Sequence, residues 1–174
     1  MLTDSGGADD GRMRTFTDES NMAATTRGYA HRIDILAPAS RVWAALLEPA
    51  LLARWYGPQA FVRPGAGGSL DVTLAPDIER QAHIDVFEPA HRLRLIYLPT
   101  AGMPAGEGAL VDDYLIHAEG DVTVVRLLGS GIPADKAWDA YYARLRGQTE
   151  RALARLKVLM ERKVAAPAHP GVPG

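Results

Sequence analysis

Residues 133–163 read PADKAWDAYYARLRGQTERALARLKVLMERK, and this stretch decides the fold. Pro133 suits a first helical turn, Asp135 complements the positive end of a helix dipole, and Arg162 complements the negative end. Side chains recurring at alternating steps of three and four lie on one stripe of an α-helix. That stripe comprises Trp138, Tyr142, Leu145, Thr149, Ala152, Leu156 and Leu159. We therefore predict an amphipathic helix of roughly 45 Å, which needs a broad apolar cover.

The composition is that of a globular protein. The chain of 174 residues is 47% hydrophobic and 23% charged, has a net charge of -2 and contains no cysteine. The charge gives no reason to expect nucleic acid or an anionic membrane as a partner. The lack of cysteine excludes disulfides, thiolate catalysis and thiolate metal sites. No apolar run has the length of a signal peptide or a membrane span, so we expect a cytoplasmic protein.

Both ends of the chain differ from its middle. Residues 1–25 and 164–174 are rich in small and polar residues without periodicity, and they are predicted to be disordered tails. Either Met1 or Met22 is the true start. The intervening residues 26–163 form the predicted domain.

Alternating apolar and polar residues between these ends predict strands. The alternating segments lie at residues 29–35, 70–74, 82–86, 93–97, 109–117 and 122–128. Two short helical patterns, residues 37–47 and 50–56, follow the first strand. Strands at hairpin spacing followed by one helix favour an α+β architecture. We predict a curved antiparallel sheet of about six strands wrapped on the long C-terminal helix.

Four motifs carry a family resemblance. They are the valine-tryptophan segment Ala37–Leu46, the Trp55-Tyr56-Gly57-Pro58 motif, the double-glycine turn Gly65–Ser69 and the segment Phe87–Leu93. In this order they resemble the START and Bet v 1-like helix-grip (SRPBCC) superfamily, and in particular the branch named for the C-terminal domain of the heat-shock-protein ATPase activator. The resemblance spans about residues 29–159. A glycine-tryptophan pair is common ahead of the long helix in that family, and here Trp138 is expected to take its place.

The resemblance implies a mostly apolar cavity between the sheet and the long helix. Matching the family pattern places Asp112 and Tyr114 inside and Asp113 outside. Arg92, Arg94 and Arg126 are assigned to the outer face, because an unpaired buried guanidinium is costly. The expected lining is Leu70, Val72, Ile84, Val86, Leu95, Tyr97, Asp112, Tyr114, Trp138, Tyr142 and Leu145. Ordinary core packing also accounts for most of these residues, and Asp112 also fits a solvated aspartate at a strand end.

The resemblance implies binding of a small hydrophobic or aromatic ligand by a carrier, a sensor or a self-resistance protein of antibiotic or polyketide metabolism. Self-resistance includes sacrificial cleavage by an enediyne, for which the loop Pro99–Gly108 is the candidate region. One alternative is a cyclase, aromatase or lyase-like enzyme in which a buried Asp112 with a raised pKa acts beside Tyr114. Another is a partner of the heat-shock ATPase. We expect a monomer or homodimer without metal or cofactor, since no histidines stand at ligand spacing.

Overall fold

The computed structural model describes residues 25–106 and 108–162, so the predicted tails lie outside the described residues apart from Thr25. The strands are β1 (Thr26–Ile35), β2 (Ala60–Arg63), β3 (Ser69–Ala75), β4 (Ile78–Glu88), β5 (Arg92–Leu98), β6 (Leu110–Glu119) and β7 (Val122–Pro133). The helices are α1 (Ala39–Leu47), α2 (Pro49–Trp55), the short 3₁₀ helix η1 (Lys136–Trp138) and α3 (Asp139–Glu161).

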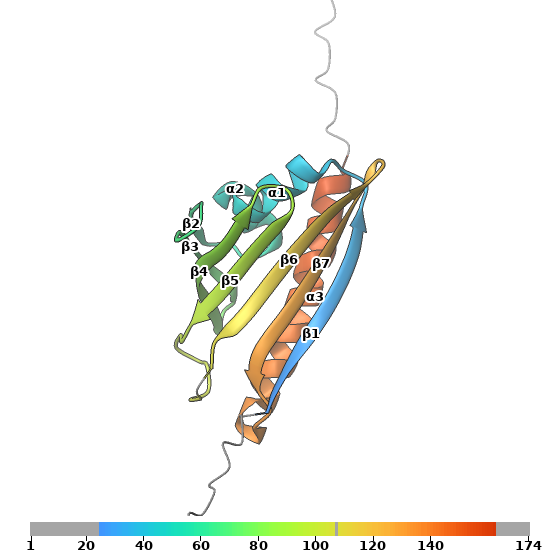
Figure 1. Cartoon of the computed structure of the whole chain (residues 1–174). Coiled ribbons are helices and arrows are strands. Elements are labelled where there is room, and N and C mark those ends of the chain that lie inside the picture. The colour runs from blue at the N-terminus through green and yellow to red at the C-terminus, as the bar shows by residue number, and fades with distance from the viewer. Residues whose placement is uncertain (1–24, 107, 163–174) are drawn as a thin grey trace, which may run out of the picture.

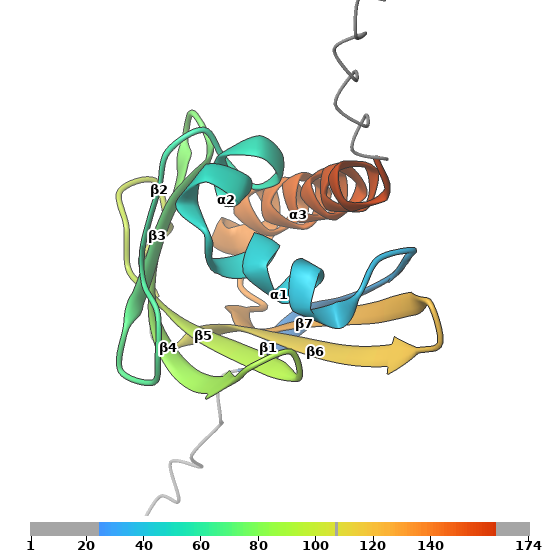
Figure 2. The same cartoon turned by 90° about the horizontal axis from the view of Figure 1, so that it is seen from above.

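The strands form one seven-stranded sheet in the order β1-β7-β6-β5-β4-β3-β2, with every neighbouring pair antiparallel. Figure 1 shows α3 running along the sheet, and Figure 2 shows the sheet curving around α3 with α1 and α2 on the same side. The predicted α+β fold is therefore confirmed. The additional strand is β2, which is too short to show alternation and is held by its pairing with β3.

The long helix starts later than predicted. Pro133 pairs with Thr26 at the end of β7, and the backbone N–H of Ala134 donates to the carbonyl of Thr25 at 2.9 Å. The side chain of Asp135 then accepts a hydrogen bond of 2.7 Å from the N–H of Ala137 and caps η1. The predicted start at Pro133 was wrong because strand pairing holds these residues in an extended conformation.

The buried stripe of α3 also differs from the predicted one at its first and last turns, where Tyr141 and Met160 are buried in place of Tyr142 and Leu159. It consists of Tyr141, Leu145, Thr149, Ala152, Leu153, Leu156 and Met160. Tyr141 is buried, whereas Tyr142 lies at the edge of the helix, where its hydroxyl donates to the carbonyl of Gly28 at 2.8 Å. The inward position assigned to Tyr142 was therefore wrong by one residue. In the described part of the chain, no helix has both the length and the apolar character that crossing a membrane requires.

A β-bulge corrects the assignment of Val86. The register between β4 and β5 shifts between Ile84 and Val86, which places Val86 opposite Arg94 and Phe87 opposite the buried Leu93. An extra residue in one strand reverses the alternation beyond it. Phe87, rather than Val86, packs against the core, with its ring 5.2 Å from that of Trp43.

Candidate functional site

Asp112 lies near the start of β6 with its carboxylate in the core, and only 1% of the residue is exposed. The next residue, Asp113, points to the opposite face of the sheet, where Arg92 and Arg94 bind it at 2.7 and 2.9 Å. Hydrogen bonds from Arg92 and Arg94 lower the pKa of Asp113, although partial burial opposes them. The inward placement of Asp112 and the outward placement of Asp113 agree with the family pattern.

The counter-ion of Asp112 is Arg80 of β4. Its Nη1 atom donates to Oδ2 of Asp112 at 3.0 Å, and the two side chains are 2% and 1% exposed. The Arg80 guanidinium also lies 3.5 Å from the ring centre of Tyr97 on the intervening strand β5. Arg80 was not among the predicted residues, because it precedes the predicted strand at residues 82–86, whereas β4 already begins at Ile78. A signal was present nonetheless, since Arg80 is two residues from the inward Ala82.

Tyrosine hydroxyls complete the hydrogen bonding of this ion pair. Tyr29 donates to Oδ1 of Asp112 at 2.5 Å, and Tyr97 donates to Oδ2 at 3.0 Å. The hydroxyl of Tyr56 lies 3.5 Å from both Nη1 of Arg80 and the hydroxyl of Tyr97. We call these five residues the Arg80–Asp112 cluster. The five residues come from strands β1, β4, β5 and β6 and, in the case of Tyr56, from the position directly after α2. The fold as a whole therefore positions the cluster.

A glycine makes room for Tyr29. Gly129 of β7 pairs with Tyr29, and a Cβ atom at position 129 would lie 2.3 Å from the Tyr29 ring. Neither Tyr29 nor Tyr56 was a predicted site residue. Tyr29 was assigned only to a strand and Tyr56 only to a structural motif, so their hydroxyls become visible as site groups only when the strands are assembled.

Burial sets the protonation of the phenols. It raises the pKa of Tyr29, Tyr97 and Tyr114 well above the ordinary value, and the charge of Asp112 adds to this effect. Burial alone would lower the pKa of Arg80, but Asp112 and the neighbouring tyrosines outweigh it, so that pKa is raised. At neutral pH these three phenols are therefore uncharged and able to donate hydrogen bonds, next to a fixed cation.

The predicted lining residues fall into two groups. Those that the structure buries around or near the cluster are Leu70, Val72, Ile84, Leu95, Tyr97, Asp112, Tyr114, Trp138 and Leu145. Val86 and Tyr142 are only partly buried and do not belong with them. Tyr141 takes the inward position instead, and its pKa is raised by burial, with smaller effects from Arg80, Tyr56 and Asp112.

A hollow of about 470 Å³ lies at the end of the molecule where α3 begins. It is lined by Thr25, Ala105, Gly106, Pro133, Ala134, Asp135, Ala137 and Trp138. The indole N–H of Trp138 donates to the carbonyl of Ala105 at 3.2 Å, and its ring meets Tyr141 edge to face at 5.5 Å. Trp138 therefore lines the hollow and also contacts Tyr141 at the first turn of α3. Within residues 25–106 and 108–162, no three His, Asp or Glu side chains are grouped to hold a metal ion.

Comparisons with known proteins identify the family of the chain. The family described as Activator of Hsp90 ATPase homolog 1-like protein matches residues 36–161. A comparison with curated proteins gave no match. The solution structure of the Aha1 dimer from Colwellia psychrerythraea is 16% identical, covers 78% of this chain and 96% of its own, and has a TM-score of 0.65.

Two further solved structures have the same fold. Norcoclaurine synthase from Thalictrum flavum, in complex with dopamine and hydroxybenzaldehyde, is 17% identical, with 80% of this chain and 90% of that chain covered and a TM-score of 0.60. DynU16, a putative protein in the dynemicin biosynthetic locus, is 18% identical and has a TM-score of 0.62. The match covers 77% of this chain and 47% of the DynU16 chain. At these identities the structures establish the fold alone. The family match covers most of the chain, which therefore belongs to the Activator of Hsp90 ATPase homolog 1-like family.

Proposed function

We propose that the protein binds a small hydrophobic or aromatic molecule between the sheet and α3, with a polar group of that molecule at the Arg80–Asp112 cluster. The observation that carries this proposal is the buried ion pair itself, 3.0 Å long and ringed by phenols. Apolar residues of similar volume often stabilise a core as well as a buried ion pair does or better, so stability alone is a weak reason for such a pair. Buried, strongly perturbed titratable groups mark candidate functional sites.

The chemistry of the cluster defines the ligand class. Phenol hydroxyls and one guanidinium offer hydrogen bonds to a carbonyl, phenol or carboxylate oxygen, while the surrounding Leu95 and Leu145 offer apolar contacts. Arg80, Tyr97 and Asp112 are buried, so binding requires a rearrangement. We place the entrance at the hollow beside Trp138, where release of the Trp138–Ala105 hydrogen bond would open a route past Tyr141.

Two of the related structures are consistent with this class of ligand. The norcoclaurine synthase structure holds dopamine and hydroxybenzaldehyde, which are small aromatic molecules, on the same fold. DynU16 is described as a protein of the dynemicin locus. We therefore favour a carrier, sensor or sequestering role, including self-resistance, for a monomer or homodimer. The Colwellia relative is described as a dimer.

A ligand panel tests the proposal. Phenols, aromatic polyketides, sterols and fatty acids are added to the full chain, and the thermal midpoint and the indole NMR signal of Trp138 are followed. One class of ligand should raise the thermal midpoint of the protein and move the NMR signal of Trp138. The double variant Arg80→Met with Asp112→Leu should abolish both effects.

The outer face of the sheet offers a matched control. Arg94→Met with Asp113→Leu makes the same chemical change to another arginine–aspartate pair, at 2.9 Å. That variant should bind the ligand as the unmodified protein does. Equal loss of binding in both double variants, or no response to any member of the panel, would reject the proposal.

Catalysis is the second candidate, favoured by the 2.5 Å hydrogen bond between Tyr29 and Asp112 inside the core. A cyclase, aromatase or lyase-like enzyme would use Asp112 and Tyr114 on the bound substrate. Asp112→Asn and Tyr114→Phe should then abolish turnover and retain binding, whereas retained turnover would reject their catalytic role. Exposure to an activated enediyne, with mass spectrometry, tests sacrificial cleavage within Pro99–Gly108, and an intact chain argues against it. A pull-down with the heat-shock ATPase tests the role in the family name.

A further inference from the structure

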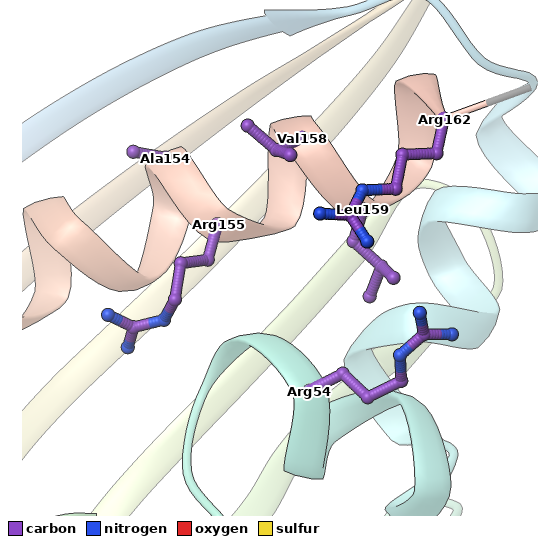
Figure 3. A pocket seen from close by; sticks show the side chains of 6 residues that line it. All are labelled: Arg54, Ala154, Arg155, Val158, Leu159 and Arg162. Atoms are coloured by element: carbon purple, nitrogen blue, oxygen red, sulfur yellow. The ribbon is translucent and has the colours of Figure 1, made fainter.

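A second hollow, of about 350 Å³, lies where α2 faces the C-terminal end of α3. Its lining consists of Arg54, Ala154, Arg155, Val158, Leu159 and Arg162 (Figure 3). None of these residues belongs to the Arg80–Asp112 cluster or to the hollow beside Trp138. We call it the arginine groove.

Arginines from two helices meet in this groove. Figure 3 shows Arg54 extending from α2 toward α3, and the guanidinium of Arg162 lying near Leu159. Arg155 lies one turn before Leu159, and its Nε atom donates to the carbonyl of Trp55 at 2.8 Å. Trp55 is buried, so this hydrogen bond fixes one cation of the groove to the core.

The charges of the groove are not neutralised within the described part of the chain. Arg54, Arg155 and Arg162 form no ion pair with any described carboxylate. Some other arginines are paired, since Arg92 binds Asp113 and Arg144 of α3 binds Asp77, whereas Arg126 of β7 has no described ion pair either. Several uncompensated cations on one concave surface create a local positive potential, even in a chain whose net charge is -2.

The groove also has an apolar component. Leu159 points between the two helices in Figure 3, and Val158 beside it is 54% exposed. All lining residues except Leu159 are exposed, so a bound molecule would remain largely in contact with water. Small-molecule sites bury most of their ligand, whereas open surfaces that combine cations with apolar side chains suit a segment of another protein.

We propose that the arginine groove docks an acidic segment of a partner protein, with carboxylates at Arg54, Arg155 and Arg162 and one apolar side chain at Val158 and Leu159. The three arginines complement an acidic segment in charge, and Val158 and Leu159 provide an apolar contact. Exposed charge pairs of this kind govern specificity and association rate and weaken with added salt. This docking surface is independent of the proposed ligand site, so either proposal can fail alone.

The test uses the full chain and a fluorescein-labelled twelve-residue peptide of glutamate with two leucines, followed by anisotropy. Binding should weaken about tenfold in each of the single variants Arg54→Glu and Arg162→Glu, and binding by the unmodified protein should weaken with added salt. The control Arg126→Glu reverses an exposed arginine on β7 and should change affinity by less than about twofold. Circular dichroism confirms that all variants are folded.

Four outcomes would overturn the proposal. The first is equal binding by the groove and control variants, and the second is no binding of the peptide at low salt. The third is undiminished binding of a peptide whose leucines are replaced by serine, which would indicate a simple anion site. The fourth concerns the acidic residues of the chain itself: if Asp9→Lys with Asp10→Lys tightens peptide binding tenfold, the occupant is this segment of the chain and not a partner.

Discussion

The Nη1 atom of Arg80 lies 3.0 Å from Oδ2 of Asp112, and the pair spans β5, the strand between β4 and β6. The guanidinium reaches across over the ring of Tyr97, which also donates a hydrogen bond to the same carboxylate oxygen. One polar contact therefore ties together three neighbouring strands beneath α3. Its energetic and functional roles can be separated by substitution.

Removing one member of the pair should destabilise the fold more than removing both. Asp112→Leu leaves Arg80 buried without a counter-charge, which should cost about 3–5 kcal/mol, whereas Arg80→Met with Asp112→Leu should recover most of that loss. Urea unfolding at pH 7 measures the free energies. The outer-face variant Asp113→Leu serves as the control and should cost about 1 kcal/mol, since Arg92 and Arg94 are partly exposed. A double variant that is as unstable as Asp112→Leu alone would contradict this account.

Gly129→Ala should displace Tyr29 from Asp112. The added Cβ would lie 2.3 Å from the tyrosine ring, too close without movement of the ring or the strand. We expect a loss of about 1–3 kcal/mol, as for overpacked cores, together with weaker ligand binding. Ser130→Ala, at the exposed neighbouring position, should have little effect on either quantity. Unchanged stability in Gly129→Ala would show that Tyr29 is not held as described.

The buried phenols predict a loss of stability at high pH. The pKa values of Tyr29, Tyr97 and Tyr114 are raised by burial, so above pH 10 the folded chain retains protons that the unfolded chain releases. Their stabilising contribution is complete below pH 10 and declines as the pH rises toward the raised values, by about 1.4 kcal/mol per pH unit for each tyrosine. Chemical unfolding between pH 8 and about 11.5 gives the slope, and Tyr97→Phe should reduce it. A stability independent of pH in this range would exclude the effect.

The bulge in β4 predicts opposite sensitivities at neighbouring positions. Phe87→Ala removes a ring packed against Trp43 and should cost about 2 kcal/mol, whereas Val86→Ala on the outer side should cost less than about 1 kcal/mol. Thermal or urea unfolding distinguishes the two. If Val86→Ala cost more stability than Phe87→Ala, Val86 would face the core, as the simple alternation first predicted.

The repeating patterns of the sequence were sufficient for the architecture and insufficient for the centre of the site. The period-two segments and the amphipathic C-terminal stretch predicted the sheet and the helix, and the family pattern placed Asp112 and Tyr114 inward. Arg80 was overlooked because the predicted strand began at Ala82, whereas β4 begins at Ile78, and because its partner Asp112 is supplied by a strand two places away. Tyr141 could not be told from Tyr142, since their adjacent positions both lie near the apolar stripe of a helix.

The position of β1 beside β7 affects how the molecule is made. Tyr29 donates to Asp112 across 83 residues, and β1 pairs with the last strand rather than with its neighbours in the chain. Contacts between distant segments slow folding, because a long loop must close before they form. During synthesis, the hairpins from β2 to β6 can form before β7 exists, while β1 must wait for it. Tyr29 would then join the cluster last, so a chain interrupted before β7 would contain Arg80 and Asp112 without the strand that completes their surroundings.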